Sequence, residues 1–422
     1  MNGKILLVFF TFLYLFETRL YTVLMPYGSI CLIPLFTIYG LFSKKYLKIL
    51  MKNLFSVYFF RISFFFIFLL VYCIFVGMRC GDFKFCGTVC HQFLCFISAM
   101  FLFSYYQKNG CDSCIVTNVI LCYILMGIIQ FICLNPLIRD FFDVFRSEET
   151  LYYRSFYDGY RGLAISSGAF FALGTGYALC FLLIGYKIFD LKLSFFTFIF
   201  STFILLFGAI SAARSSLFGV PMAFLIVLFN NIFNRKKYLF NNCLLKKTES
   251  KFFVYTLIGI ILFILVLFFI SELGNKSVEA FFFYIKSFLD GFFNGEGLRS
   301  STSGKALLDG FYTDISFDQI LIGDGRYVGI DSPNYMHQDS GFFRNLLFGG
   351  LPIVIFLLII QFLAITPLLL NKNKKIRFLG FSIFILAVFF HIKGEVLGLG
   401  IHYQNILYLI SLYIVGKKNE EL

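Results

Sequence analysis

The sequence has few charged residues and no tryptophan. Charged side chains make up 14% of its 422 residues, whereas water-soluble domains usually carry about a quarter. Hydrophobic residues make up 59%, which excludes a soluble two-domain enzyme with one anchor and predicts an integral membrane protein. Sustained alternation of polar and apolar residues is also missing, which argues against an outer-membrane barrel.

Long apolar runs dominate what is present. A membrane-crossing helix takes about 20 residues, and 12 such helices leave about 180 residues for loops. We therefore expect an all-α, polytopic inner-membrane protein that forms a single transmembrane domain over residues 1–422. The predicted transmembrane helices are 4–24, 27–42, 55–78, 91–106, 114–134, 164–186, 193–213, 216–233, 252–271, 346–370, 378–392 and 397–415.

Lysine clusters between these runs set the expected orientation. Basic loops stay in the cytoplasm, and all four clusters agree with one topology in which both termini are cytoplasmic. The clusters comprise Lys44, Lys45, Lys48 and Lys52; Arg235, Lys236, Lys237, Lys246, Lys247 and Lys251; Lys372, Lys374, Lys375 and Arg377; and Lys417 and Lys418.

Basic residues differ in type between the two predicted faces. Ten of the 15 placed outside are Arg, whereas 18 of the 20 placed inside are Lys. Lys suffices as a point charge to hold topology, but the planar fork of Arg matches phosphate oxygens. The outer face is therefore predicted to bind an anion.

Two predicted periplasmic loops are long, and loops of such length are usually functional or disordered. Loop 135–162 carries Arg139, Arg146, Arg154 and Arg161. Loop 272–341, between predicted helices 9 and 10, is expected to form part of an active site. Its phenylalanines between 281 and 293 have helix-like spacing and predict a segment folded on the membrane surface.

Several short motifs lie on this outer face. Arg214 sits in the turn Ser211-Ala-Ala-Arg-Ser-Ser, which fits either a compact phosphate site or an arginine snorkelling at a helix end. The late loop contains Arg299, the segment Gly323-Asp-Gly-Arg-Tyr327 and the segment His337-Gln-Asp-Ser-Gly-Phe-Phe-Arg344. Turn amides beside glycines can cradle anions, although Asp and Gly are also ordinary turn residues. Gly349-Gly350 is expected to open the next helix.

This ordered set of motifs resembles Wzy-type O-antigen polymerases, which belong to a wider O-antigen polymerase and ligase superfamily. Those proteins carry an Arg, ten residues and then a Gly in each of two long periplasmic loops. Arg299 and Gly310 match that spacing, whereas no Arg of loop 135–162 has Gly at the matching distance. The motif similarity covers about 154–217 and 299–352.

The resemblance implies transfer of a growing glycan from undecaprenyl pyrophosphate to a sugar hydroxyl of another lipid-linked repeat unit. Guanidinium groups would stabilise the departing pyrophosphate, and the expected ones are Arg161, Arg214, Arg299, Arg326 and Arg344. A proton acceptor must reach the attacking hydroxyl, and the candidates are His337, Asp339 and then Asp324. Each of these three candidates can equally be a residue that caps a turn or one that pairs with an Arg.

No metal or cofactor is expected. Cys111 and Cys114 have zinc-like spacing without a second pair, and a Walker-type glycine loop is missing, so the activated lipid must supply the energy. Expected partners are undecaprenyl-pyrophosphate-linked glycans, the lipid bilayer, a chain-length regulator and a flippase, with no nucleic acid.

Two alternative functions remain open. An O-antigen ligase, which transfers polymer to lipid A core, shares the architecture and usually uses a late-loop His, for which His337 is the candidate. A flippase or secondary transporter fits the number of helices, but should place charges within spans and show related halves. Charged residues here lie mostly in loops, with Arg61 the clearest exception.

Overall fold

In the described residues of the computed structural model, every element of regular secondary structure is a helix. The all-α prediction is therefore confirmed for these residues. The structure describes residues 3–18, 28–146, 148–155, 160–187, 195–235, 315–329 and 335–420, and the isolated positions Glu279, Phe283, Lys286, Asp290 and Asn294. The chain divides into two compact units. Unit 1 comprises Met1–Cys31, Ser113–Tyr284 and Leu368–Ile383, and unit 2 comprises Leu32–Asp112, Ile285–Pro367 and Phe384–Leu422.

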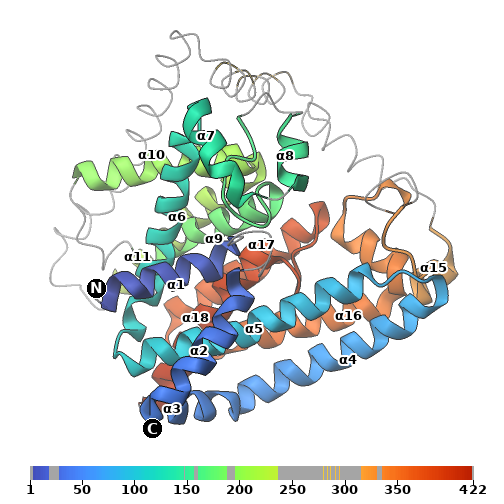
Figure 1. Ribbon diagram of the computed structural model, residues 1–422, viewed down its shortest axis with the longest axis horizontal. Helices are drawn as coiled ribbons and strands as arrows, with labels where there is room; N and C mark the ends of the chain where they lie inside the picture. The colour runs from blue at the N-terminus through green and yellow to red at the C-terminus, as the bar shows by residue number, and fades with distance from the viewer. Residues whose placement is uncertain are drawn as a thin grey trace. The chain divides into compact units, whose positions relative to one another are not determined.

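Unit 1 is built around close helix packing (Figure 1). Its main helices are α1 (Gly3–Phe16), α6 (Ile115–Ile132), α9 (Phe171–Lys187), α10 (Phe195–Ala212) and α11 (Gly219–Arg235). Helix α9 packs on α11 at a point where a Cβ on Gly219 would lie 2.4 Å from the carbonyl oxygen of Ala178. A Cβ on Gly174 would lie 2.8 Å from that of Ala213. These glycines permit the helix backbones to approach each other closely.

Short helices occupy the predicted outer loop of unit 1. They are α7 (Pro136–Phe142), the 3-10 turn η2 (Asp143–Phe145) and α8 (Glu148–Ser155). The Asn135 side chain caps α7 by accepting a hydrogen bond from the Leu137 amide, and Pro136 occupies the first helical position. The described part of this loop is therefore folded and can position the arginines that it carries.

Unit 2 contains α3 (Lys44–Leu54), α4 (Val57–Cys80), α5 (Lys84–Lys108), α15 (Phe317–Ile322), α16 (Gly341–Leu369) and α18 (Ile401–Glu420). Helices α4, α5 and α16 run alongside one another in Figure 1. Two tyrosines of α4 donate to backbone carbonyls of α16: Tyr58 to Ala364 at 3.0 Å and Tyr72 to Gly349 at 2.9 Å. Helices α2 (Gly28–Phe42) and α17 (Lys374–Lys393) each contribute to both units, and the last two residues of α16 belong to unit 1.

Within the residues that the structure describes, five stretches are long and apolar enough to cross a membrane: Val57–Cys80, Lys84–Lys108, Asp112–Ile132, Gly341–Leu369 and Lys374–Lys393. Five shorter apolar helices accompany them: Gly3–Phe16, Gly28–Phe42, Phe171–Lys187, Thr197–Ala212 and Arg214–Asn230. These ten helices coincide with ten of the twelve predicted runs, although their boundaries differ. Run 252–271 lies outside the described residues, and run 397–415 corresponds to α18.

Three local expectations need correction. The first run was expected to extend to residue 24, but α1 ends at Phe16 and Glu17 takes a left-handed φ of 48°. The Lys44 cluster was read as a loop, but it forms α3, because Tyr46 and Leu50 lie one helical turn apart and are both buried. Gly349 and Gly350 do not open a helix; they interrupt α16, which begins at Gly341.

Candidate functional site

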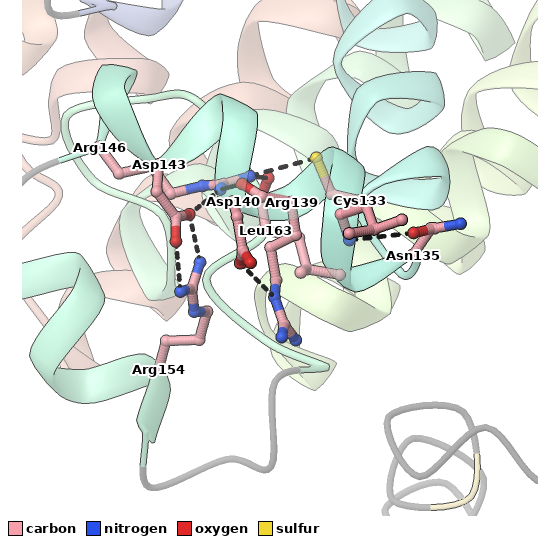
Figure 2. Close-up of polar contacts among 9 residues, drawn as sticks. Cys133, Asn135, Arg139, Asp140, Asp143, Arg146, Arg154 and Leu163 are labelled. Carbon is pink, nitrogen blue, oxygen red and sulfur yellow. Dashed lines mark hydrogen bonds and ion pairs between the residues drawn. The ribbon is translucent and has the colours of Figure 1, made fainter.

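The side chain of Arg146 is wholly buried and ties loop 135–162 to the chain that follows it (Figure 2). A guanidinium carries five N–H donors. Those of Arg146 bond to the carbonyl oxygens of Arg139, Leu163 and Ala164, to the carboxylate of Asp143 and to the sulfur of Cys133. All five donors have partners within unit 1, so Arg146 holds the loop together and is not free to grip an anion.

Arg154 binds the same carboxylate from the other side. Its two terminal nitrogens donate to the two oxygens of Asp143 at 2.5 and 2.7 Å, which is a bidentate pair (Figure 2). Burial alone would raise the pKa of Asp143, but hydrogen bonds from Arg154 and Arg146 outweigh it and lower that pKa below its ordinary value. Asp143 is thus an anion that binds two arginines, Arg146 and Arg154.

Arg161 lies at the turn that carries Arg214. One terminal nitrogen of Arg161 donates to the carbonyl oxygen of Ala212 at 2.8 Å, two residues before Arg214. The guanidinium carbon also lies 5.3 Å from the centroid of the Phe170 ring. Arg214 is half-buried and begins the 3-10 helix η3 (Arg214–Phe218) between α10 and α11. Arg161, one of the five predicted pyrophosphate-binding arginines, therefore contacts the backbone of the turn that carries a second one, Arg214.

A buried polar network fixes this turn. Gln130 on α6 donates to the hydroxyl of Ser211 at 2.9 Å and accepts a hydrogen bond from the hydroxyl of Tyr177 on α9. Ser216 donates to the carbonyl oxygen of Ala213 at 2.6 Å. Buried groups with partners rigidify their surroundings, so the backbone around Arg214 is held by three helices.

In unit 2, the predicted Gly-Asp-Gly-Arg-Tyr segment is held at the interruption of α16. The amides of Asp324 and Gly325 donate to the carbonyl oxygens of Leu347 at 2.6 Å and Phe348 at 2.8 Å. The carboxylate of Asp82, in the turn after α4, accepts from the amides of Tyr327 at 2.7 Å and Val328 at 2.9 Å. These contacts bring residues that are far apart in sequence into one folded loop.

Glycines make this arrangement possible. Gly323, Gly325 and Gly350 have φ values of 65°, 76° and 68°, a region that side chains disfavour. A Cβ on Gly323 would also lie 2.6 Å from the amide nitrogen of Gly349. The glycines predicted to cradle an anion thus serve first to let two backbone segments meet.

Tyr327 is the centre of a charged cluster in unit 2. The residue is 4% exposed, and its ring packs against Phe85 with ring centroids 5.1 Å apart. The guanidinium carbon of Arg344 lies 4.2 Å from the ring centroid, and the Tyr327 hydroxyl donates to Oε2 of Glu395. Burial, and then the negative charge of Glu395, raise the pKa of Tyr327 well above its ordinary value, so the hydroxyl keeps its proton and remains a donor.

The other predicted site residues have separate environments. Asp324 accepts from the Gln319 side chain at 2.8 Å, Arg326 is exposed, and Asp339 is exposed. His337 closes the 3-10 turn Tyr335–His337, and its side chain lies outside what the structure describes. Arg299, Gly310 and most of the phenylalanine segment at 281–293 also lie outside the described residues.

Sequence reasoning missed Asp82, Glu395 and the role of Tyr327. Glu395 sits in the short turn between α17 and α18, where a single acid carries no spacing signal. The one available hint was that Glu395 is an acid at the predicted outer end of two apolar runs.

Comparisons with models of protein families, with curated proteins and with solved structures found no match to this chain.

Proposed function

We propose that this chain is a membrane glycosyltransferase that polymerises undecaprenyl-pyrophosphate-linked repeat units into O-antigen or capsular polysaccharide. In this proposal the chain crosses the inner membrane about 12 times, with both termini in the cytoplasm. Loops 135–162 and 272–341 then face the periplasm, where the lipid-linked substrates meet.

One observation carries the proposal: the guanidinium of Arg161 reaches the carbonyl oxygen of Ala212, beside Arg214. A diphosphate needs several donors at one place, and a pair of arginines can supply planar forks without a metal ion. Arg146 and Arg154 are occupied by Asp143 and backbone oxygens, so we do not assign the diphosphate to them.

In the proposed reaction these arginines must stabilise the leaving group. As the bond between the anomeric carbon and the phosphate oxygen breaks, negative charge accumulates on the pyrophosphate. Fixed guanidinium groups stabilise that charge more than they stabilise the intact donor, which lowers the barrier. The network of Gln130, Tyr177 and Ser211 keeps the backbone that carries Arg214 in place, which supports such preorganisation.

Polysaccharide gels of a gene deletion and its complemented strains test the proposal. We expect the deletion, Arg161→Ala and Arg214→Ala to leave single repeat units on lipid A core, while the wild-type gene restores the ladder. Lys372→Ala, which changes an exposed basic residue on the opposite predicted face, should keep the ladder.

Other outcomes of the deletion would assign another function. Free polymer with bare core would identify a ligase, and loss of all surface sugar would identify a flippase. An unchanged ladder would exclude all three functions.

A further inference from the structure

We propose that helix α3 (Lys44–Leu54) lies in the plane of the membrane interface and binds the headgroups of anionic phospholipids. Lipid binding by α3 is independent of the proposed glycosyl transfer. It requires only that the apolar helices of the chain lie in a membrane, and every residue that carries it belongs to unit 2.

Helix α3 has three chemically different faces. Residues four positions apart share one side of a helix. Tyr46 and Leu50 are buried, whereas Leu47 and Met51 are apolar and exposed. The third face consists of four exposed lysines: Lys44, Lys45, Lys48 and Lys52. A helix between protein and water needs only a buried face and a polar one, so the exposed apolar face indicates a further environment, which is lipid.

The buried face fixes α3 on α5. The Tyr46 hydroxyl donates to the carbonyl oxygen of Phe101 at 3.2 Å. The Asn53 side chain donates to the hydroxyl of Ser104 at 2.8 Å and to Oε1 of Gln107 at 2.9 Å. Helix α3 thus lies beside the start of α4 and the end of α5 (Figure 1). These bonds hold the other two faces outward.

The exposed apolar face continues onto the neighbouring elements. Phe42, just before α3, is 86% exposed, and Phe55, just after it, is 65% exposed. Helix α4 follows, and six of its exposed apolar residues recur every three or four positions: Val57, Phe60, Phe64, Phe68, Val71 and Phe75. Lipid chains would cover such a stripe, whereas water would not. Helix α3 lies at one end of this stripe, where acyl chains give way to headgroups.

The lysines carry charge that the stability of the helix does not explain. Lys44 and Lys45 stand in the first turn, where the helix dipole disfavours a positive charge, and the Ser43 side chain does not cap the helix. The helix contains no acid, and its lysines form no ion pair with an acid among the described residues. An anionic phosphate group would satisfy both the lysines and the helix N-terminus.

An anionic phospholipid matches all the exposed features of α3 at once. Its acyl chains cover Leu47 and Met51, and its phosphate binds the lysines, whose long stems can reach headgroups at the interface. An acidic protein segment would neutralise the lysines but would leave the apolar face in water. The lysine clusters predict that α3 lies at the cytoplasmic face, where anionic lipids make the membrane surface negative.

The absence of tryptophan from the sequence allows one introduced tryptophan to report on α3 alone. Leu47→Trp and Lys48→Trp place it at adjacent positions that point about 100° apart around the helix. Each full-length variant is reconstituted in vesicles of phosphatidylcholine and phosphatidylglycerol. We expect brominated acyl chains to quench Leu47→Trp more strongly than Lys48→Trp, and iodide in the buffer to show the opposite order.

Headgroup preference is measured by moving the bromine from one lipid to the other at constant composition. We expect brominated phosphatidylglycerol to quench Leu47→Trp as if it were about 5-fold enriched around α3 over brominated phosphatidylcholine, which corresponds to about 1 kcal/mol. High salt should weaken this preference, because it screens exposed charges.

Charge variants in the Leu47→Trp protein identify the lysines as the cause. Replacing all four with Gln (K44Q, K45Q, K48Q and K52Q) should abolish the preference, whereas replacing all four with Arg should keep it. The matched control, K372Q with R377Q, removes exposed cations from another segment and should also keep the preference. Thermal unfolding in detergent verifies that each variant is folded, and the salt dependence tests the role of charge without any change to the lysines.

Three results would overturn the proposal. They are equal quenching by the two brominated lipids, a preference that survives loss of all four lysines, and iodide reaching Leu47→Trp as readily as Lys48→Trp. The last result would instead make α3 a surface for an acidic protein segment. Because the assay contains no glycan, its outcome does not depend on whether the chain is a polymerase.

Discussion

Arg146 donates to the carbonyl oxygen of Leu163, 17 residues further along the chain, and so closes the predicted outer loop of unit 1 on itself. The same guanidinium holds Asp143, which also binds Arg154 (Figure 2). The loop therefore has an internal charged core, and Arg161 near its end donates to the carbonyl oxygen of Ala212.

Replacing Arg146 should destabilise the protein strongly. Arg146→Ala leaves Asp143 with one partner and strands three buried carbonyl oxygens, and breaking such a pair costs about 3–5 kcal/mol. Arg146→Lys should rescue little, because an ammonium group cannot replace five fixed donors. Thermal unfolding of purified protein in detergent measures the effect, with Asp140→Asn as a control because that side chain is 70% exposed. Equal unfolding midpoints for the wild type and Arg146→Ala would contradict the assignment.

Asp143 should make the protein sensitive to acid. Its pKa is lower in the folded protein than the ordinary value of about 4. Its contribution to stability is therefore present above that value, and is lost as the pH falls through the folded-state pKa. Asp143→Asn should be less stable than the wild type at pH 6, and should lose less stability between pH 6 and pH 3. Parallel decreases in the two unfolding midpoints would argue against this coupling.

Arg214 should depend on its planar fork as well as its charge. We expect Arg214→Ala to lower transfer about 10²- to 10³-fold, the usual cost of removing one donor to a developing anion. Arg214→Lys should recover only part of that loss, because an ammonium group cannot make two parallel hydrogen bonds to a phosphate. Initial rates with the reconstituted protein measure both variants. Full recovery by Lys would mean that charge alone suffices.

The apolar runs sufficed to predict most long helices, because burial of backbone groups in lipid demands helices of defined length and composition. The short helices α7 and α8 escaped prediction since neither is long enough to show a hydrophobic period. The contacts between side chains could not be predicted from the sequence for another reason. Tyr327 and Glu395 are 68 positions apart, and only tertiary folding brings them together.

The contact between the Gly323 segment and α16 should be intolerant of any side chain. Gly350→Ala would place a Cβ 2.4 Å from the carbonyl oxygen of Leu321, at a φ of 68°. The left-handed conformation alone costs about 1–2 kcal/mol for a residue with a Cβ, and the clash adds to it. We expect a lower unfolding midpoint, because the clash displaces the Gly323 segment from its hydrogen bonds with α16. Gly87→Ala in α5 is the matched control: its Cβ would meet nothing within 4 Å, and alanine favours a helix, so its midpoint should hold or rise. If both alanine variants behaved alike, the close approach of the two segments would not be what stabilises this loop.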